Sequence, residues 1–530
     1  LPAVNFSGLK DRSIRLKNTV VKHKELSIVV SLLFAARLFL SNLQSYWLDE
    51  HYSVWAYGSY FSNPFEMGFF FAKESVHPPL YQMTLWFYMK IFGDSEIATR
   101  TLSNIFIAIA MIALYALIRD AVPKWLAVLA AAVYGAEPSG ILYAIETRSY
   151  AMTLALSIVS LLALKRFVLG SAAGYRKNFW LFTFAIAGLM FTHYYNMFLV
   201  GALGAYLLTQ LAMFKSDKKL GKRYLQGVWA ILTGVAMYAV IWGAIFVVQF
   251  FFKKGKYAGT DKLNIFDMYN SMLVDLNLDA SSVIITVLVY VSGAIAFTVL
   301  FLQIRKRSFK YQSLENVLLQ LTFATFLPIL ASYVAFVAIN AARESSRYYI
   351  YSAALLPVFM LLAFYWAIEK FAKAKNANRK KTWQAVVASA FVLAAVLPQS
   401  VAAANEGKIN WRGTIQFATE WSEENYPGGV NFVEVSFRPK PMSAYYIGKN
   451  NYQPLTLHTI QKLHDETAVV TDYTPEKLSI TKAKPLLILY LVHYEGRLTT
   501  LATALSTYYD VVERYIDHDG HGFVVYVPKG

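Results

Sequence analysis

Residues 26–51 of the chain read LSIVVSLLFAARLFLSNLQSYWLDEH, an apolar run of membrane-spanning length that is followed closely by an acidic pair. An α-helix needs about 20 predominantly apolar residues to cross the hydrocarbon core of a bilayer, and residues 26–43 come close to that length. A basic segment precedes this run, and no small-residue cleavage site follows it. We therefore expect a retained membrane helix rather than a signal peptide that is removed.

Similar apolar runs recur as far as residue 404. Hydrophobic residues make up 56% of the 530-residue chain and charged residues only 16%, and a soluble chain of this length cannot bury that much apolar surface. The sequence therefore predicts a polytopic α-helical membrane protein with about eleven transmembrane helices. The predicted spans are residues 26–43, 97–118, 124–140, 149–167, 178–193, 196–214, 226–250, 282–304, 315–339, 350–368 and 382–403.

Basic residues follow the membrane topology. The formal net charge is +17, and Lys and Arg gather before the first predicted span and after the second, fourth, sixth, eighth and tenth. If the spans alternate in direction, these six segments lie on one side, which the positive-inside rule assigns to the cytoplasm. Lys253, Lys254 and Lys256 fall on the other side. This distribution does not form the single basic patch of a nucleic-acid-binding protein.

The sequence changes character after residue 404. Helical patterns at 412–425 and 498–508 alternate with short β-type runs at 430–435, 467–471, 486–491 and 522–527. Strands that alternate with helices predict a small α/β domain. We expect residues 1–404 to form a membrane domain and residues 405–530 an extracytoplasmic domain.

Two adjacent carboxylates, Asp49 and Glu50, follow the first predicted span on its outer side. A carboxylate at the membrane surface can act as a general base or hold a divalent cation. Adjacent residues on a helix diverge by about 100°, so we expect only one of the pair to face a site. Ordinary solvated contact with lipid headgroups is the alternative.

The chain has no cysteine, which excludes disulfides and thiol chemistry.

Two histidine motifs also lie in segments expected outside the cytoplasm. In HPPLY, at residues 77–81, two prolines stiffen the turn and can present His77 and Tyr81 in a fixed geometry. A simple helix-start signal is the alternative. His193, Tyr194 and Tyr195 occupy a short turn, where a histidine can donate to an anion, bind a metal or merely sit at the interface.

Three arginines are candidates for binding an anion. Arg37 lies within the first predicted span, where an arginine costs roughly 2.5–3.5 kcal/mol on insertion scales and should face protein or a wet cavity, unless it snorkels. Arg148 and Arg347 lie at the outer ends of spans, where the planar guanidinium could clamp a phosphate. A salt bridge between Arg148 and Glu146, and interfacial anchoring by Arg347, are the alternatives.

Together these motifs resemble the GT-C superfamily of polyprenyl-phosphate-sugar-dependent glycosyltransferases. The closest pattern is the branch of protein O-mannosyltransferases and the lipid A aminoarabinose transferase, which includes many family-39-like enzymes. His77 departs from the aminoarabinose branch, which tends to carry lysine before the paired prolines. The matching pieces are Arg37, WLDE at 47–50, HPPLY at 77–81, FGDSE at 92–96, Arg100, ETRSY at 146–150, THYY at 192–195, Arg347-Tyr348 and Trp411-Arg412.

The resemblance implies a single inverting displacement, with hexosyl or pentosyl transfer. Asp49 would take the proton from an acceptor hydroxyl, a polyprenyl phosphate would leave, and Glu50 would orient the acceptor or share a metal. Among the other candidates, the phosphate-binding residues would be Arg148, Arg347, His193 and Arg37, and the substrate-positioning residues would be His77, Tyr81, Tyr194 and Tyr195.

The implied partners are a polyprenyl-phosphate sugar donor, a glycan, lipid or protein acceptor and membrane lipids, without nucleic acid. No cofactor is implied beyond a possible divalent cation. The implied location is a bacterial plasma membrane. Two other readings stay open: a transporter or flippase of a lipid-linked sugar, in which charge deep within the spans would mark the pathway, and a non-catalytic scaffold of the same fold.

Overall fold

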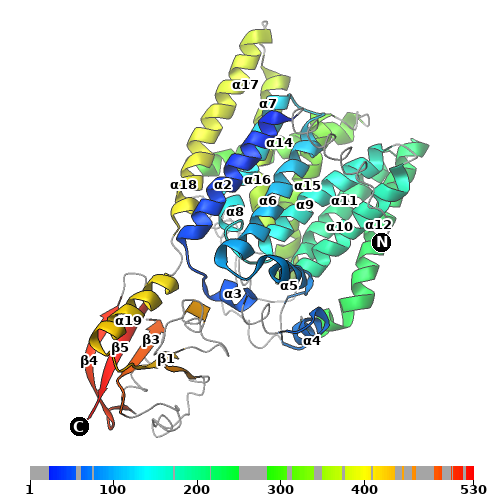
Figure 1. Ribbon diagram of the computed structural model, residues 1–530. Coiled ribbons are helices and arrows are strands. Elements are labelled where there is room, and N and C mark those ends of the chain that lie inside the picture. Colours follow the sequence, from blue (N-terminus) through cyan, green and yellow to red (C-terminus); the bar gives the residue numbers. More distant parts are fainter. Residues whose placement is uncertain are drawn as a thin grey trace, which may run out of the picture. The chain divides into compact units, whose positions relative to one another are not determined.

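The chain forms two compact units in the computed structural model (Figure 1). Unit 1 comprises Leu1–Leu40, Asn63–Tyr88 and Arg100–Glu406, and unit 2 comprises Ser41–Ser62, Met89–Thr99 and Gly407–Gly530. The structure describes residues 23–54, 61–74, 77–170, 174–214, 217–249, 283–306, 313–338, 349–372, 377–406, 410–435, 445–446, 456–460, 483–491, 503, 505–516 and 521–529.

Unit 1 is a helical bundle. The last residues of α2 and α5 and the first turn of α6 fall in unit 2. The helices that lie in unit 1, wholly or in part, are α2 (Lys24–Leu43), α4 (Pro64–Glu74), α5 (Leu80–Phe92), α6 (Glu96–Ile118), α7 (Lys124–Ala136), α8 (Pro138–Leu142), α9 (Tyr150–Leu169), α10 (Tyr175–Thr192), α11 (Asn196–Met213), α12 (Lys218–Val247), α14 (Val283–Lys306), α15 (Leu314–Ala338), α16 (Ile350–Phe371), α17 (Ala377–Phe391), the π-helical η6 (Val392–Val396) and α18 (Leu397–Asn405).

Each of the eleven predicted apolar runs coincides with one of these helices or with a consecutive set of them. Within the described residues, eight helical stretches are long and apolar enough to cross a membrane, fewer than the eleven predicted. Two of the predicted spans differ for local reasons: α7 has only 13 residues, and α10 begins with basic and polar residues. The fold class is confirmed, and the chain is an integral membrane protein.

Close helix packing holds the bundle together. Helices α9, α10 and α12 lie side by side, and α15 packs between α11 and α16 (Figure 1). A Cβ atom added to Gly234 of α12 would lie 2.8 Å from the carbonyl oxygen of Thr183 in α10. Lipid supplies little hydrophobic drive for helices to associate, so such small residues, which let backbones approach, stabilise the interface through van der Waals contact.

The predicted span 124–140 is broken at Glu137. This residue has an extended backbone, and its buried carboxylate accepts hydrogen bonds from the amides of Ser139 and Gly140 at 2.9 and 2.6 Å. Pro138 follows at the first helical position. An acidic N-cap followed by proline is a strong helix start, because it satisfies amides that have no partner within the helix. The apolar run is therefore two helices, α7 and α8.

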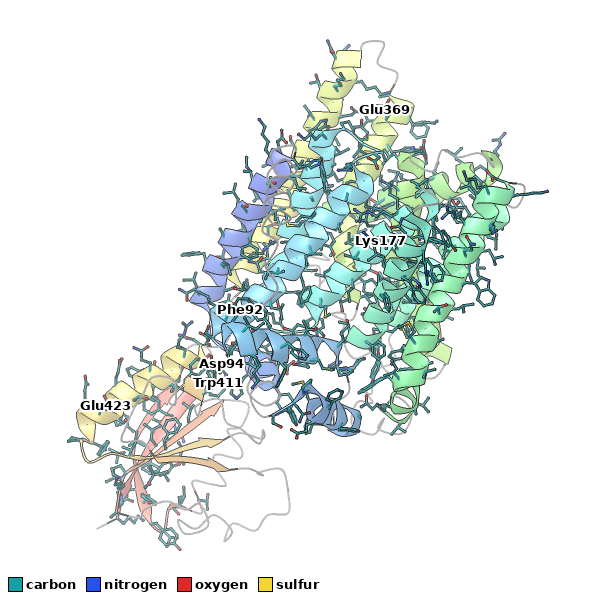
Figure 2. All side chains as sticks on the ribbon, turned by 45° about the vertical axis from the view of Figure 1, so that its right-hand side comes forward. Phe92, Asp94, Lys177, Glu369, Trp411 and Glu423 are labelled. Atoms are coloured by element: carbon teal, nitrogen blue, oxygen red, sulfur yellow. The ribbon has the colours of Figure 1, made fainter. Side chains whose placement is uncertain are left out.

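Polar contacts join helices elsewhere in the bundle. Glu369, near the end of α16 (Figure 2), accepts hydrogen bonds from Lys380 Nζ at 3.2 Å and Gln384 Nε2 at 2.7 Å, both on α17. Arg223 of α12 stacks over Tyr175, with its guanidinium carbon 4.6 Å from the ring centroid. Lys380 and Arg223 come from predicted cytoplasmic segments. Each connects its own helix to a neighbouring helix through these contacts.

Unit 2 contains a mixed sheet with strand order β2-β1-β3-β5-β4. Strand β1 pairs in parallel with β2 and β3, whereas β5 pairs antiparallel with β3 and β4. Helix α19 packs on β5, and Trp411 and Glu423 mark its two ends (Figure 2). The elements are the short helix α3 (Leu48–His51), α19 (Trp411–Asn425), β1 (Asn431–Val435), β2 (Thr456–Ile460), β3 (Leu486–Leu491), β4 (Tyr509–Ile516) and β5 (His521–Pro528).

The predicted α/β character of this part is confirmed. The predicted runs 430–435, 486–491 and 522–527 match β1, β3 and β5, and 412–425 matches α19. The run 467–471 and most of the predicted helix 498–508 lie outside the described residues, as does the Lys253–Lys256 cluster. Strands β2 and β4 were not predicted.

Candidate functional site

Two histidines and an arginine from three separate segments of unit 1 lie close together. The ring centroids of His77 and His193 are 5.0 Å apart, and the positive charge of Arg148 acts on both rings. The ring centroids of Tyr150 and Tyr195 lie 6.1 and 5.7 Å from that of His193. We call these five residues the histidine cluster.

The junction between α10 and α11 positions His193. Helix α10 ends at Thr192, and His193 follows with an extended backbone, φ −156° and ψ 137°. The side-chain amide of Asn196 donates to the carbonyl of Leu189 at 2.8 Å and to Thr153 Oγ1 at 3.3 Å. These bonds fix a turn that leaves His193 between two helices.

The segment before α9 positions Arg148. Ser103 of α6 donates from its hydroxyl to the carbonyl oxygen of Glu146 at 2.7 Å, and the Arg148 amide donates to the same oxygen at 2.9 Å. The ring of Tyr143 lies 4.8 Å from that of Tyr150, between centroids. The loop that bears Arg148 is therefore anchored to α6 at one end and begins α9 at the other.

His77 precedes the paired prolines that start α5. The Met83 amide donates to the carbonyl of Pro79 at 2.9 Å, so the prolines do begin a helix, and they also hold His77 beside His193. The helix-start alternative therefore describes this motif, and a functional role for His77 stays a prediction. Tyr81 lies buried in the first turn of α5, and its predicted role in substrate positioning stays a prediction.

Burial controls the protonation of the two histidines. It lowers the pKa of His193 to about 3 and that of His77 well below its usual value, and the positive charge of Arg148 lowers both further. The Tyr195 amide donates to His193 Nδ1 at 3.3 Å, so in the neutral ring the proton is on Nε2. At neutral pH both rings are uncharged hydrogen-bonding groups, and Arg148 supplies the charge.

Tyr194 connects the same turn to other helices. Its hydroxyl accepts from Trp242 Nε1 at 3.0 Å and donates to Gln249 Oε1, and Gln249 Nε2 donates to the carbonyl of Ala72 at 3.0 Å. Burial raises the pKa of Tyr194 to about 12, so it stays protonated and can donate. Tyr194 therefore ties the His193 turn to α12 and α4, and its predicted contact with substrate stays a prediction.

The start of α16 lies beside the cluster. Tyr351 donates from its hydroxyl to the carbonyl of Tyr195 at 3.2 Å, and the ring of Tyr349 lies 5.9 Å from that of Tyr195, between centroids. Arg347 lies outside the described residues, and its predicted role in phosphate binding stays a prediction.

Arg37 is buried and hydrogen-bonded within the bundle. Its Nε donates to Asn104 Oδ1 at 2.9 Å and its Nη1 to the carbonyl of Gly135 at 2.7 Å, and Met111 Sδ lies 3.8 Å from Nη2. The guanidinium therefore faces protein, as expected for a charge inside a span. This arrangement gives Arg37 a role in joining α2, α6 and α7, and binding of the donor phosphate stays a prediction.

The two candidate carboxylates belong to unit 2 and differ in their surroundings. Glu50 is buried, and its Oε2 accepts from the Trp47 amide at 3.3 Å, which is the reciprocal bond of a helix capping box. Asp49 is half-buried, and its backbone carbonyl accepts from Ser53 Oγ at 3.0 Å. The two neighbours therefore differ in burial. Asp49 is the better candidate for proton transfer.

Sequence reasoning missed residues that support the cluster rather than those at its centre. Tyr150 was part of a motif but had no assigned role, and Tyr349, Tyr351 and Gln249 had none. Two of these three residues had a sequence signal: Tyr349 ends an outer turn that contains Arg347, and Gln249 is a polar residue at the end of an apolar run. Among the described residues, no group of three or more His, Asp or Glu side chains could hold a metal ion; the possible divalent cation stays a prediction.

The helical bundle defines the chain as a polytopic membrane protein. Its inter-helix segments bring two histidines together, with an arginine whose charge acts on both. A family model described as Dolichyl-phosphate-mannose-protein mannosyltransferase matches residues 76–242, which include the whole histidine cluster. No curated protein matches the chain.

Solved structures match along nearly the whole chain. ArnT from Cupriavidus metallidurans bound to undecaprenyl phosphate is 14% identical, with a TM-score of 0.50 over 94% of this chain and 97% of its own. The oligosaccharyltransferase of Archaeoglobus fulgidus, tethered with an acceptor peptide, is 13% identical, with a TM-score of 0.49 over 96% of this chain and 74% of its own. The likeness to ArnT shows that the chain shares its fold with that protein.

Proposed function

We propose that the chain is a glycosyltransferase that moves a sugar from a polyprenyl-phosphate donor to an acceptor hydroxyl on the extracytoplasmic face of the membrane. The observation that carries the proposal is the convergence of His77, Arg148 and His193. The family-model match, whose description is a mannosyltransferase that uses a lipid phosphate, covers the same residues.

The histidine cluster has the chemistry to hold a lipid phosphate. Arg148 offers a charged planar fork that suits phosphate oxygens, and neutral His193 offers Nε2–H as a further donor. In a partly dry site such donors stabilise charge more strongly than they do in water. They would therefore stabilise the phosphate as it leaves the anomeric carbon. The negative charge would also offset the effect of Arg148 and raise the pKa values of both histidines.

Asp49 would act as the general base. It would take the proton of the acceptor hydroxyl as the hydroxyl oxygen attacks the anomeric carbon. In the same step the bond between the anomeric carbon and the phosphate oxygen would break. The products would be the glycosylated acceptor, with inverted configuration, and polyprenyl phosphate. Glu50, whose carboxylate accepts from Trp47, would hold the short helix that presents Asp49.

The topology follows from the basic segments, which the positive-inside rule places in the cytoplasm. The segments that carry Asp49, His77, Arg148 and His193, together with the C-terminal domain, would then be extracytoplasmic, in a bacterial plasma membrane. The sugar would be a hexose or a pentose, and the acceptor a glycan, a lipid or a protein. His77 does not favour aminoarabinose.

A transporter of lipid-linked sugars is the alternative from another class. Such a protein would carry charge deep in its spans along a pathway. Three buried basic residues in the described helices of unit 1 are Arg37, Arg100 and Lys165. Arg37 bonds to Asn104, and Lys165 bonds to the carbonyl of Leu117 at 2.7 Å and to Asp120 at 3.0 Å. These contacts favour a structural role for Arg37 and for Lys165.

Transfer of a radiolabelled sugar from a panel of polyprenyl-phosphate sugars tests the proposal. We expect transfer by the purified wild type and a loss of about 100-fold or more in Asp49→Asn, because a general base typically contributes 10²–10⁴-fold. Asp510→Asn, which changes an exposed carboxylate of β4, should keep full activity. Equal transfer by Asp49→Asn would remove Asp49 from the mechanism. No transfer by the wild type with any sugar would favour the transporter or a non-catalytic scaffold.

A further inference from the structure

Three parts of unit 2 that are far apart in sequence meet at the backbone of Tyr46. The Tyr46 amide donates to Glu96 Oε1 at 2.9 Å and to the hydroxyl of Tyr446 at 2.8 Å. The Tyr446 hydroxyl in turn donates to Glu96 Oε1 at 2.6 Å. Tyr446 is therefore both donor and acceptor, between the segment that precedes Asp49 and the first residue of α6.

Further contacts surround this centre. The Tyr46 hydroxyl lies 2.6 Å from Thr99 Oγ1 and donates to the carbonyl of Asp94 (Figure 2) at 3.0 Å. The Tyr445 hydroxyl donates to the same carbonyl at 3.1 Å, and the rings of Tyr46 and Tyr445 lie 5.4 Å apart, between centroids. Two consecutive tyrosines of the C-terminal part thus bind two neighbouring segments.

Arg412, in the first turn of α19, adds a second link. Its Nη1 lies 3.5 Å from Glu96 Oε2, and its Nη2 donates to the carbonyl of Asn42 at 3.2 Å. We call Tyr46, Glu96, Thr99, Arg412, Tyr445 and Tyr446 the Tyr46 network. Both oxygens of the Glu96 carboxylate take part in this network: Oε1 accepts from Tyr46 and Tyr446, and Oε2 pairs with Arg412. Through Arg412 the network also contacts Asn42, near the end of α2.

Burial makes these bonds specific. Tyr46, Thr99, Tyr445 and Tyr446 are all buried, and a buried polar group that loses its partner cannot be satisfied by water. Burial and the negative charge of Glu96 raise the pKa of Tyr446 well above its usual value, so its hydroxyl stays protonated across the physiological range.

The network adjoins the short helix that carries Asp49. Trp47, the next residue after Tyr46, donates from its amide to Glu50 Oε2, and the ring of His51 lies 6.1 Å from that of Tyr445, between centroids. Both ends of α3 are therefore held, one through Tyr46 and the other beside Tyr445. Asp49 lies between these two points and remains half-buried.

We propose that the C-terminal domain positions the Asp49 helix for reaction, with Tyr446 as the principal positioning residue through its bonds to the Tyr46 amide and to Glu96. Tyr445 and Arg412 support this arrangement. The consequence for catalysis rests on the proposed function, in which Asp49 is the base, but the positional part of the proposal does not depend on any activity.

A spin label tests the positional part. The chain has no cysteine, so Tyr52→Cys provides a single attachment site directly after α3 for a nitroxide. We expect the spectrum to show greater mobility when Tyr446→Phe is added to the full-length labelled protein. Tyr515→Phe removes the hydroxyl of a half-buried tyrosine of β4 and is the matched control that should leave the spectrum unchanged. Identical spectra for Tyr446→Phe and Tyr515→Phe would overturn the proposal.

Kinetics test the catalytic part, with the polyprenyl-phosphate sugar that the wild type uses. A small displacement of a reacting group can cost about 10²-fold in rate, so we expect Tyr446→Phe to lower kcat by about 10- to 100-fold while KM for the donor changes less than about twofold. Glu96→Gln keeps an acceptor for both donors and should retain more activity than Glu96→Ala. An unchanged kcat in Tyr446→Phe would overturn the catalytic part.

The two failures are distinguishable. If the wild type transfers no sugar, the proposed function fails, and the spin label alone decides whether Tyr446 holds the Asp49 helix. If the wild type is active and Asp49→Asn is not, but Tyr446→Phe behaves like Tyr515→Phe in both measurements, only the positioning role fails. Thermal unfolding of each variant shows whether any loss reflects misfolding, and a loss of activity that follows a loss of fold alone would count against the proposal.

Discussion

At the scale of single residues, the histidine cluster combines one permanent positive charge with two rings that burial keeps neutral. Burial lowers the pKa of His193 because a charged ring there would lose its hydration, and Arg148 adds repulsion. A site of this kind avoids strong internal repulsion while it is empty. If the cluster binds a lipid phosphate, as proposed, that phosphate would make protonation of the rings less costly, and the cluster would gain charge on binding.

The first prediction concerns pH and stability. His193 has a pKa of about 3 in the folded chain, against 6.5 for an ordinary histidine. Between these values the unfolded chain binds a proton that the folded chain does not, so stability falls as the pH drops below 6.5, by about 2 kcal/mol at pH 5. His193→Gln should reduce the fall in Tm between pH 8 and pH 5. Equal falls in variant and wild type would contradict the assignment.

The second prediction concerns Arg37. Asn104→Leu removes the acceptor of Arg37 Nε and leaves a buried charge with one fewer partner, which should cost about 2–3 kcal/mol of stability. Arg37→Met with Asn104→Leu should unfold at a higher temperature than Asn104→Leu alone, since no buried charge then remains at this position. Thermal unfolding in detergent measures both. A neutral effect of Asn104→Leu would show that the bond contributes little.

The sequence pointed to residues that the fold brings near one another, such as His77 and His193, and was less informative about their surroundings. His77, Arg148 and His193 were chosen because polar residues recur in segments on one predicted side of the membrane. Their protonation could not be predicted, because it depends on burial by elements far along the chain. Arg37 was correctly expected to face protein, but its acceptors on α6 and α7 are set by helix packing that has no local signature.

At the scale of elements, the apolar runs located the helices of the bundle but not all of their interruptions. Hydropathy is summed over a window, and the apolar residues around Glu137 concealed the break between α7 and α8. The strands missed in unit 2 are β2 and β4, the two edges of the sheet. Edge strands carry polar and charged residues that oppose aggregation, as Asp510 and Glu513 do in β4, so their apolar signal is weak.

The third prediction tests helix packing with two glycines. Alanine normally stabilises a helix interior relative to glycine by about 1 kcal/mol. Gly204→Ala of α11 should therefore raise Tm, because an added Cβ meets nothing within 4 Å. Gly234→Ala should lower it, by about 1–3 kcal/mol of stability, because the Cβ would meet α10. A rise in Tm for both variants would mean that α10 and α12 are not packed this closely.

At the scale of the whole molecule, the division into units cuts across the order of the sequence. The predicted boundary at residue 404 lies close to the end of unit 1 at Glu406, but Ser41–Ser62 and Met89–Thr99 join the C-terminal part in unit 2. This grouping depends on contacts such as that of Tyr46 with Tyr446. Sequence patterns report local periodicity, so partners this far apart could not be identified from them.

Binding of a lipid phosphate tests the central claim most directly, because it requires neither the sugar nor the acceptor to be known. The purified protein should bind undecaprenyl phosphate and should not bind undecaprenol at the same concentration. Arg148→Gln should weaken phosphate binding by about 10- to 100-fold, in line with the loss of a hydrogen bond to a charged group, whereas Arg119→Gln, which changes an exposed residue paired with Asp120, should not. Equal affinity for the phosphate and the alcohol, or no effect of Arg148→Gln, would contradict the account.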